Sequence, residues 1–242
     1  MERSVYERMN ALEAEHWWFM GRRRVLAALI DRLIDNHADA RILEAGCGSG
    51  GNLSMLQKFG AVDAFEYDNV ARQAASEKSG CDILFGALPD QIPFGDKPYD
   101  FIGLFDVLEH VEADEASLAA LAARLREGGR ILVSVPAFPF LWSKHDERHH
   151  HFRRYTRTTL TEVAERAGLK VTYSSYFNTF LFPAAVGARA LKKVISRETP
   201  DDQMPPMWMN KALAYVFSCE QHMIGRVSLP FGLSLAAVLE KA

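Results

Sequence analysis

The sequence predicts an α/β protein built on a doubly wound, mostly parallel sheet. From residue 41 onward, short apolar runs alternate with helical windows, which is the order of βαβ units. A cluster of glycines follows the first apolar run, as in sheets that bind a ligand beyond their strand ends. The chain has 242 residues and contains no run of about 18 apolar residues, so we expect one domain without a membrane-spanning helix.

Composition excludes several other classes of protein. The formal charge is −3, which argues against a nucleic-acid partner bound through bulk charge. Hydrophobic residues make up 48% of the chain, as in ordinary globular proteins. The three cysteines, Cys47, Cys81 and Cys219, are widely spaced, which is typical of a reducing, cytoplasmic setting. The N-terminus lacks the order of a secretory signal.

The expected elements follow from apolar periodicity and capping residues. Residues 1–39 are predicted to be helical, with an apolar stripe over 27–34. Strands are expected at 41–45, 61–66, 81–85, 99–105, 130–137, 170–177 and 232–240. Helices are expected at 52–59, 69–79, 114–127, 159–167 and 208–224, with Asp68, Asp114 and Thr159 as caps of the second, third and fourth. Residues 196–206 are polar and rich in proline, as in a linker.

The glycine loop after the first strand indicates a nucleoside ligand. Gly46, Gly48 and Gly51 satisfy the GxGxxG pattern, and Glu66 stands 20 residues beyond Gly46, where a ribose-binding acid belongs. These features alone also fit a nicotinamide enzyme. Glu44, at the end of the first strand, would repel a pyrophosphate but attract an amino group and a positive sulfur. S-adenosylmethionine carries both groups and no phosphate.

Five segments in order, residues 44–50, 65–68, 92–100, 104–111 and 125–132, resemble class I S-adenosylmethionine-dependent methyltransferases. The resemblance covers residues 40–137. It implies a Rossmann-like sheet of seven strands with an antiparallel last strand. It is consistent with the predicted N-terminal helices and with a helical insertion before the last strand. The chain then divides into an N-terminal helical cap (1–39), a cofactor-binding core (40–137) and an acceptor-side and C-terminal part (138–242).

The resemblance also implies roles by position. The backbone at Gly46 and Gly48 would approach the cofactor, Glu44 would lie near its amino group, and Glu66 would accept both ribose hydroxyls. Asp68 is the nearby rival of Glu66. The other residues implied at the cofactor are Cys47, Tyr67, Leu88 against the adenine, and Phe105 and Asp106 beside the methionine part. The sequence departs from the family at Ala87, where many relatives have an aspartate.

Residues 136–155 follow the fifth strand on the ligand side and are expected to form the acceptor site. His145 or His149 is the candidate general base, and Arg153 or Arg154 is the candidate partner of an acidic group on the acceptor, with Tyr155 beside them. The alternative is that these are ordinary loop residues. His145 and His149 lack the HExxH order, so no metal ion is expected.

Two further patches remain open to interpretation. Trp18 stands between aromatic residues and three arginines, so it could receive the acceptor or simply anchor the N-terminal helix. Residues 180–193 are apolar with a basic end, which fits core, an acceptor pocket or contact with a membrane surface.

The sequence therefore predicts an S-adenosylmethionine-dependent methyltransferase acting on a small-molecule acceptor. Oxygen is favoured as the methylated atom over nitrogen or carbon. The alternatives are an NAD(P)-dependent oxidoreductase and a regulatory protein that binds the cofactor without catalysis.

Overall fold

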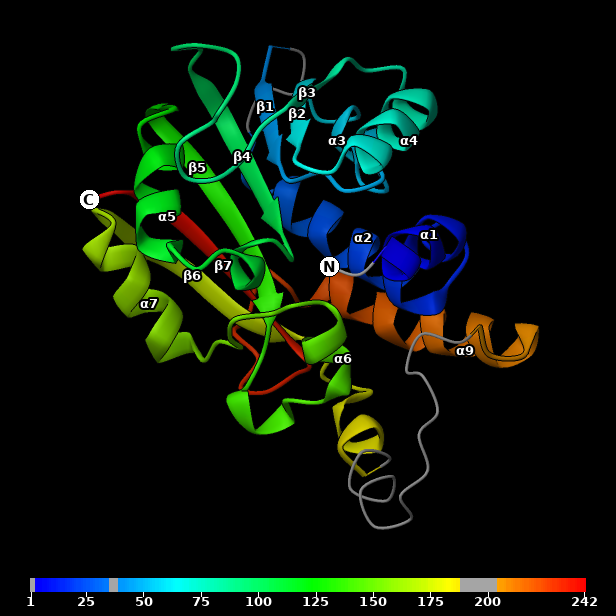
Figure 1. Ribbon diagram of the computed structural model, residues 1–242. Coiled ribbons are helices and arrows are strands. Elements are labelled where there is room, and N and C mark those ends of the chain that lie inside the picture. Colours follow the sequence, from blue (N-terminus) through cyan, green and yellow to red (C-terminus); the bar gives the residue numbers. More distant parts are fainter. Residues whose placement is uncertain (1–2, 35–38, 188–203) are drawn as a thin grey trace.

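The computed structural model describes residues 3–34, 39–187 and 204–242 (Figure 1). Its centre is one seven-stranded sheet in the order β3-β2-β1-β4-β5-β7-β6. Five strands run parallel from β3 to β5, and β7 pairs antiparallel with both β5 and β6. The strands are β1 (Arg41–Ala45), β2 (Ala61–Glu66), β3 (Ile83–Phe85), β4 (Tyr99–Phe105), β5 (Leu125–Pro136), β6 (Leu169–Phe177) and β7 (Ser234–Lys241). The predicted doubly wound sheet and its antiparallel last strand are confirmed.

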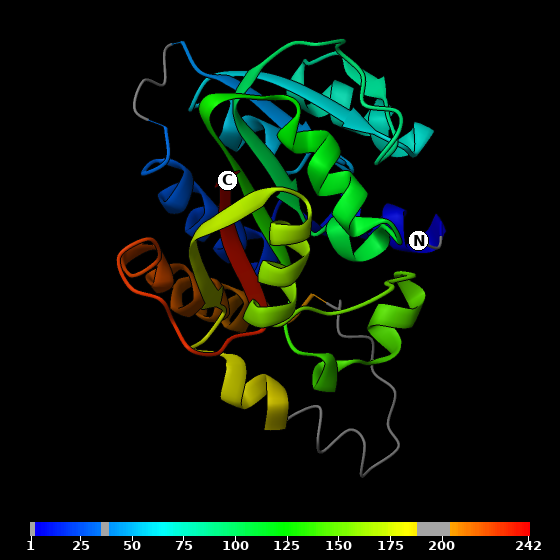
Figure 2. The same ribbon diagram turned by 90° about the vertical axis from the view of Figure 1, so that its left-hand side faces the viewer.

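Helices cover both faces of the sheet. In Figure 2, α2 and α9 lie on one side of the sheet and α5 and α7 on the other. The helices are α1 (Arg3–Leu12), α2 (Trp17–Ile30), α3 (Leu53–Leu56), α4 (Asn69–Ser79), α5 (Asp114–Ala122), α6 (Lys144–Arg148), α7 (Arg157–Arg166) and α9 (Met207–Ser218). Short 3-10 turns follow β4 (η1, Leu108–His110), β5 (η2, Pro139–Leu141) and α9 (η3, Cys219–His222).

The two faces of the sheet have separate apolar cores because strand residues alternate in direction. On one face, Leu118 of α5 and Leu160 of α7 pack against strand residues such as Leu104 and Val133. On the other face, Leu26 of α2 and Phe217 of α9 pack in a second cluster with Ile42, Phe101 and Leu132. The sheet is therefore held rigidly from both sides, which fixes the positions of its strand ends.

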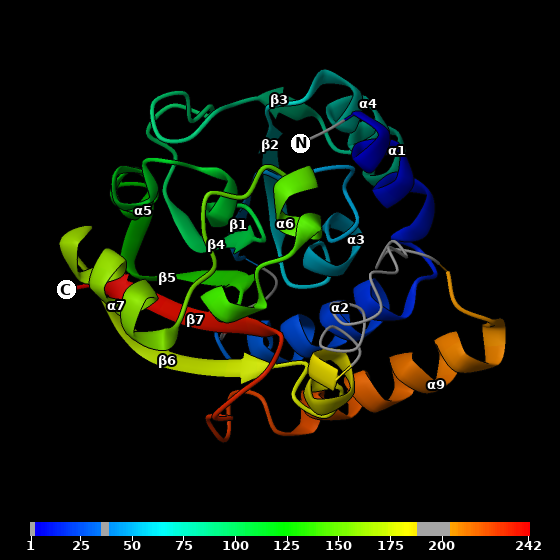
Figure 3. The ribbon, with the colours of Figure 1, turned by 60° about the horizontal axis from the view of Figure 1, so that its bottom comes forward.

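The ends of the parallel strands define one edge at which functional groups gather. The strand order reverses at β1, which has β2 on one side and β4 on the other, and ligands bind at such switch points. Figure 3 looks toward this edge, with α6 in front of the region where β1 and β4 end. The segments after β1, β2, β4 and β5 therefore lie at the edge where this fold is expected to have its ligand crevice.

The local predictions were right for the strands that flank the switch point and wrong in several helices. β1, β2 and β4 have the predicted bounds, and Asp68 caps α4 by accepting hydrogen bonds from the amides of Val70 and Ala71, both at 2.9 Å. The third strand starts at Ile83 instead of 81, and the helix expected at 52–59 is the short α3. The helix expected at 208–224 is divided into α9 and η3.

Three boundary predictions need correction for identifiable reasons. The helix expected at 114–127 ends at Ala122, because Leu125 already pairs with Tyr99 and starts β5. Asp114 is the first residue of that helix and Ala113 occupies the cap position, while the Asp114 carboxylate accepts from the Tyr155 hydroxyl at 2.9 Å. The helix expected from 159 starts at Arg157, with Thr156 as its cap.

The N-terminal helices predicted within 1–39 are α1 and α2, and the second ends at Ile30, earlier than expected. The predicted linker at 196–206 and the basic end of 180–193 lie largely outside the described residues. Within the described residues, no helix is long and apolar enough to cross a membrane.

Candidate active site

The glycine loop after β1 has a conformation that ordinary side chains would disturb. Gly46 and Gly50 have φ values of +72° and +85°, a region that residues with a Cβ rarely adopt. A Cβ on Gly50 would lie 2.8 Å from the Cα of Ala75, so this glycine also lets α4 approach the loop. A Cβ on Gly48 would meet nothing within 4 Å, so the loop is open on that side. The loop can therefore present its backbone to a ligand.

Glu66 joins the end of β2 to the glycine loop. One carboxylate oxygen accepts a hydrogen bond from the Gly48 amide and the other from the Asp68 amide, both at 2.9 Å. Burial raises the pKa of Glu66, and the two amides oppose that shift. Each oxygen keeps a second lone pair, so the carboxylate can still accept hydrogen bonds from a ligand.

Glu44 is the most buried acid at the loop, with 1% of its surface exposed. Its Oε1 accepts from Asn52 Nδ2 at 2.8 Å, whereas its Oε2 has no partner within the described structure. Burial raises the pKa of Glu44 to about 8, although Asn52 and Arg22 oppose the shift. A buried oxygen without a partner is costly, so this side of the loop is suited to a positively charged group.

Arg22 of α2 reaches across the crevice to the end of β4. Its guanidinium lies 2.5 Å from Asp106 Oδ2 and donates to Asn52 Oδ1 at 3.3 Å. It also stacks over the rings of Trp18 and Phe105, at 5.2 and 5.8 Å from their centroids. The sequence places three adjacent arginines here and does not distinguish which of them is buried; in the structure it is Arg22, with 5% of its surface exposed. Arg22 thereby brings Trp18, Phe105 and Asp106 together.

Asp106 is held in an unusual backbone conformation. Its φ is +54°, a value that is costly for a residue with a side chain. Burial raises its pKa, and Arg22 opposes the shift. Backbone strain of this kind is concentrated at functional sites, and here it turns the aspartate out of β4 into the crevice.

The segment between α1 and α2 contributes a residue that the sequence did not reveal. Glu13, in the segment between α1 and α2, accepts a hydrogen bond from Ser49 Oγ at 2.8 Å and pairs with Lys78 of α4. The local sequence does not distinguish Glu13 from a solvent-exposed acid, because the partners of its carboxylate are at least 36 residues away along the chain. The N-terminal segment therefore packs directly on the glycine loop.

The remaining residues predicted at the cofactor differ in exposure. Tyr67 is 69% exposed, and its ring lies 5.8 Å from that of Phe85, forming an open aromatic shelf beside Glu66. Leu88 is half-buried against the core. Cys47 is buried, and burial raises the pKa of its thiol, so the side chain fills space in the loop without being reactive.

The predicted acceptor segment is organised by a buried ion pair. Arg154 binds Asp146 through two hydrogen bonds, Nε to Oδ1 at 2.7 Å and Nη2 to Oδ2 at 3.0 Å. Burial alone would raise the pKa of Asp146, but hydrogen bonds from His151 and Arg154 hold it well below its usual range. Arg153 pairs with Asp114 at 2.5 Å, and Tyr155 donates to the same carboxylate. Acceptor binding by Arg153, Arg154 and Tyr155 stays a prediction, and all three side chains already have protein partners.

Four histidines cluster near α6. The rings of His145 and His149 stack at 3.9 Å, and those of His110 and His151 meet edge-on at 4.5 Å. Burial and the neighbouring histidines lower the pKa of His110 to about 3 and that of His149 to about 2. These two rings are therefore neutral at pH 7, which makes His149 a weak base. The general-base roles of His145 and His149 stay predictions.

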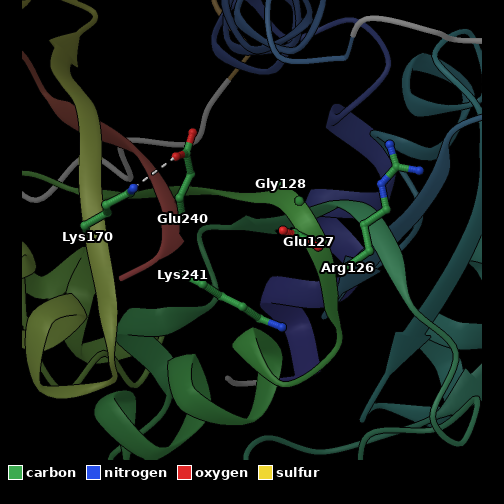
Figure 4. Close-up of a pocket in the computed structure, with 7 residues that line it drawn as sticks. Arg126, Glu127, Gly128, Lys170, Glu240 and Lys241 are labelled. Carbon is green, nitrogen blue, oxygen red and sulfur yellow. Dashed lines mark ion pairs between the residues drawn. The ribbon is translucent and has the colours of Figure 1, made fainter.

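A separate pocket lies at the opposite edge of the sheet. Figure 4 shows it between the start of β5 and β6 and the end of β7, where Lys170 and Glu240 form an ion pair at 3.8 Å. Parallel strands begin at this edge, so the pocket is remote from the glycine loop.

Comparison with known proteins agrees with this geometry. Residues 18–174 match the family model described as a methyltransferase domain. A probable S-adenosylmethionine-dependent methyltransferase of Mycolicibacterium smegmatis is 31% identical over 165 residues, which are 66% of this chain and 62% of that protein. A ubiquinone biosynthesis O-methyltransferase of Xylella fastidiosa is 36% identical over 102 residues, 40% of this chain and 42% of that protein. The chain thus spans less than two thirds of either relative.

A solved structure shows the same fold along almost the whole chain. It is a Haloferax volcanii methyltransferase in complex with the Trm112 methyltransferase activator, with 17% identity and a TM-score of 0.63, covering 98% of this chain and 94% of that one. Because the family model matches more than half of its residues, the chain belongs to the methyltransferase domain family. The resemblance to class I S-adenosylmethionine-dependent methyltransferases is confirmed, which decides against the nicotinamide oxidoreductase alternative.

Proposed function

We propose that the protein transfers the methyl group of S-adenosylmethionine to an oxygen atom of a small-molecule acceptor. The observation that carries this proposal is the pair of buried carboxylates, Glu44 and Glu66, on either side of an open glycine loop. Two acids at this position suit a cofactor with two hydroxyls and a cationic end, because a bound cation favours the ionised form of a buried acid.

Each part of the cofactor has a matching group. Glu66 accepts from the ribose hydroxyls with its remaining lone pairs, and Glu44 Oε2 faces the amino group. The adenine lies against Leu88 and the shelf made by Tyr67 and Phe85. Phe105 and Asp106, held by Arg22, border the methionine part.

Methyl transfer needs little covalent chemistry from the protein. The acceptor oxygen forms a bond to the methyl carbon as the carbon–sulfur bond breaks, the electron pair stays on sulfur, and the hydroxyl proton passes to solvent. Alignment of the two reactants provides much of the acceleration. The acceptor approaches over α6 and the end of β4, where Asp106, Trp18 and the histidines lie. Similarity to the Xylella fastidiosa O-methyltransferase over 102 residues supports oxygen as the acceptor atom.

Thermal unfolding with S-adenosylmethionine, S-adenosylhomocysteine and NADH tests the cofactor assignment. A ligand at 100 times its Kd adds about 2.7 kcal/mol, which corresponds to a rise of about 5–11 °C for a chain of this size. We expect this rise with both S-adenosyl compounds and none with NADH.

Two variants assign the ribose contact. Glu66→Gln keeps one acceptor oxygen for the loop but loses the charge, so the ligand-induced rise should shrink. Asp68→Asn is the matched control, because asparagine caps a helix as well as aspartate does. If the ligand raises the melting temperature of Glu66→Gln as much as that of wild type, but raises that of Asp68→Asn less, the ribose contact is assigned to Asp68. A rise with NADH alone would overturn the proposed function.

A further inference from the structure

A carboxylate and two imidazoles converge beside α6 from two separate segments. Glu109 and His110 belong to η1, directly after β4, and His151 follows α6. One ligand atom from each of the three residues lies within 4.8 Å of the other two. The backbone connects the segments, since the Phe152 amide donates to the Glu109 carbonyl at 2.8 Å. The spacing between these groups is therefore fixed by the fold.

Glu109 is buried without full hydrogen bonding. It is 1% exposed, and its Oε2 has no partner within the described structure. A carboxylate oxygen in this state loses its hydration without compensation, unless a cation or a donor occupies the space in front of it. The unpartnered oxygen is independent of the clustering of the three residues.

His151 is oriented as metal-binding histidines commonly are. Its Nδ1 lies 2.9 Å from Asp146 Oδ1, and Asp146 is held by the guanidinium of Arg154. A carboxylate paired with arginine only accepts hydrogen bonds, so Nδ1 is the donor, and in the neutral ring Nε2 then has the lone pair that a metal ion needs. A carboxylate behind a histidine fixes its tautomer and raises its strength as a ligand. Asp146 is thus a positioning residue.

We propose that Glu109, His110 and His151 bind one divalent transition-metal cation, such as Zn²⁺ or Fe²⁺. Imidazole ligands favour these ions over Mg²⁺ and Ca²⁺, which prefer oxygen. Three protein ligands leave an open position, as in catalytic zinc sites. This assignment replaces the metal-free site expected from the sequence, which considered only His145 and His149.

The open position gives the cation a role that rests on the proposed function. The site begins three residues after Asp106, on the acceptor side of the crevice. An acceptor hydroxyl bound to the cation releases its proton to solvent more readily. The oxygen then forms the bond to the methyl carbon while the carbon–sulfur electron pair moves to sulfur. The preferred acceptor is therefore one that offers a metal-binding hydroxyl.

Cobalt binding to the full chain tests the site without cofactor or acceptor. Protein stripped with a chelator and titrated with Co²⁺ should bind one equivalent, with visible absorption bands that Zn²⁺ abolishes. His151→Ala and Glu109→Gln should each weaken binding at least tenfold. His222→Ala, at an exposed histidine of η3, should leave it unchanged. Far-UV circular dichroism confirms that each variant is folded.

Several outcomes would overturn the proposal. These are no cobalt binding, equal binding by wild type and His151→Ala, or a thiolate charge-transfer band that assigns the ion to a cysteine. S-adenosylhomocysteine binding to the metal-free protein is measured in parallel. Cobalt bound without S-adenosylhomocysteine binding would leave the metal site standing and contradict the proposed function, whereas the reverse would contradict only the metal site.

Discussion

The two halves of the crevice are built in different ways. On the proposed cofactor side, Glu44 and Glu66 lie at the ends of the neighbouring parallel strands β1 and β2, and the glycine loop follows β1. The positions of these groups are therefore determined mainly by the sheet, as in the hydrogen bond between the Gly48 amide and Glu66. On the acceptor side, the groups come from η1, from α6 and from the segment after α6, and a buried ion pair holds them together. The first half depends on the sheet, and the second depends on a few side-chain contacts.

The sharpest test of this difference is Asp146→Asn. The change leaves the buried guanidinium of Arg154 without its charge partner, and breaking a buried pair costs about 3–5 kcal/mol. Urea unfolding measures the loss. The matched control is Glu147→Gln, at the next and exposed residue.

The same variant tests the independence of the two halves. Binding of S-adenosylhomocysteine to folded Asp146→Asn should stay within a factor of about three of wild type, because the glycine loop makes no contact with Asp146 among the hydrogen bonds of the described residues. A large loss of cofactor binding would mean that the halves act as one unit.

Arg22 is the exception, because it connects the halves. Arg22→Met keeps a side chain of similar length beside the aromatic rings. It removes the positive charge that pairs with Asp106 and the donor that binds Asn52 Oδ1. Hydrogen bonds to charged groups contribute about 1.5–3 kcal/mol, so we expect a loss of stability in that range and weaker cofactor binding. Urea unfolding measures the change in stability, and titration calorimetry with S-adenosylhomocysteine measures the change in cofactor affinity. Arg24→Met, on the same helix, is the control, and equal effects of both changes would remove Arg22 from the site.

The contrast explains what could be predicted from the sequence. β1, β2 and β4 were assigned with the right bounds because buried parallel strands are short apolar runs bounded by glycine and polar residues. Glu44 and Glu66 could be proposed as cofactor ligands from the sequence because they occupy fixed positions at the ends of those strands. Arg22, Glu13 and His151 were missed because their partners lie far away in the sequence, and only packing reveals that they are buried.

The length of α5 was missed for a related reason. Its apolar and alanine-rich pattern continues past Ala122, and helix propensity alone favours continuation. Pairing of Leu125 with Tyr99 makes those residues part of the sheet. Tertiary pairing therefore overrides local preference at this boundary, and no local pattern reports it.

Glu44 gives the cofactor side a dependence on pH. With a pKa of about 8, its carboxyl is mostly protonated at pH 7, and a bound cation would favour the ionised form. Binding of S-adenosylmethionine should therefore release a proton, and affinity should rise about tenfold from pH 6 to pH 7. Calorimetry in buffers of different ionisation enthalpy measures the proton. Glu44→Gln should bind more weakly and without this slope, and a persistent slope would assign the proton to another group.

The unliganded protein should show the opposite dependence. Its Glu44 retains a proton that the unfolded chain releases near pH 4.5, so this residue destabilises the fold as pH rises from about 4.5 to 8. Glu44→Gln should flatten that part of the stability curve.

The smallest expected effect concerns the packing of the N-terminal segment on the glycine loop. Ser49→Ala removes the hydrogen bond to Glu13, whose carboxylate keeps its pair with Lys78 and is not left alone. One hydrogen bond contributes about 1 kcal/mol, so the melting temperature should fall by about 2–4 °C. Ser54→Ala, at an exposed serine of α3, is the control. Because Ser49 belongs to the loop that Glu66 holds from the other side, cofactor affinity should also fall with Ser49→Ala. If Ser49→Ala and Ser54→Ala have the same melting temperature and cofactor affinity, the cofactor side depends on the sheet alone. The N-terminal segment then packs on the glycine loop without stabilising it.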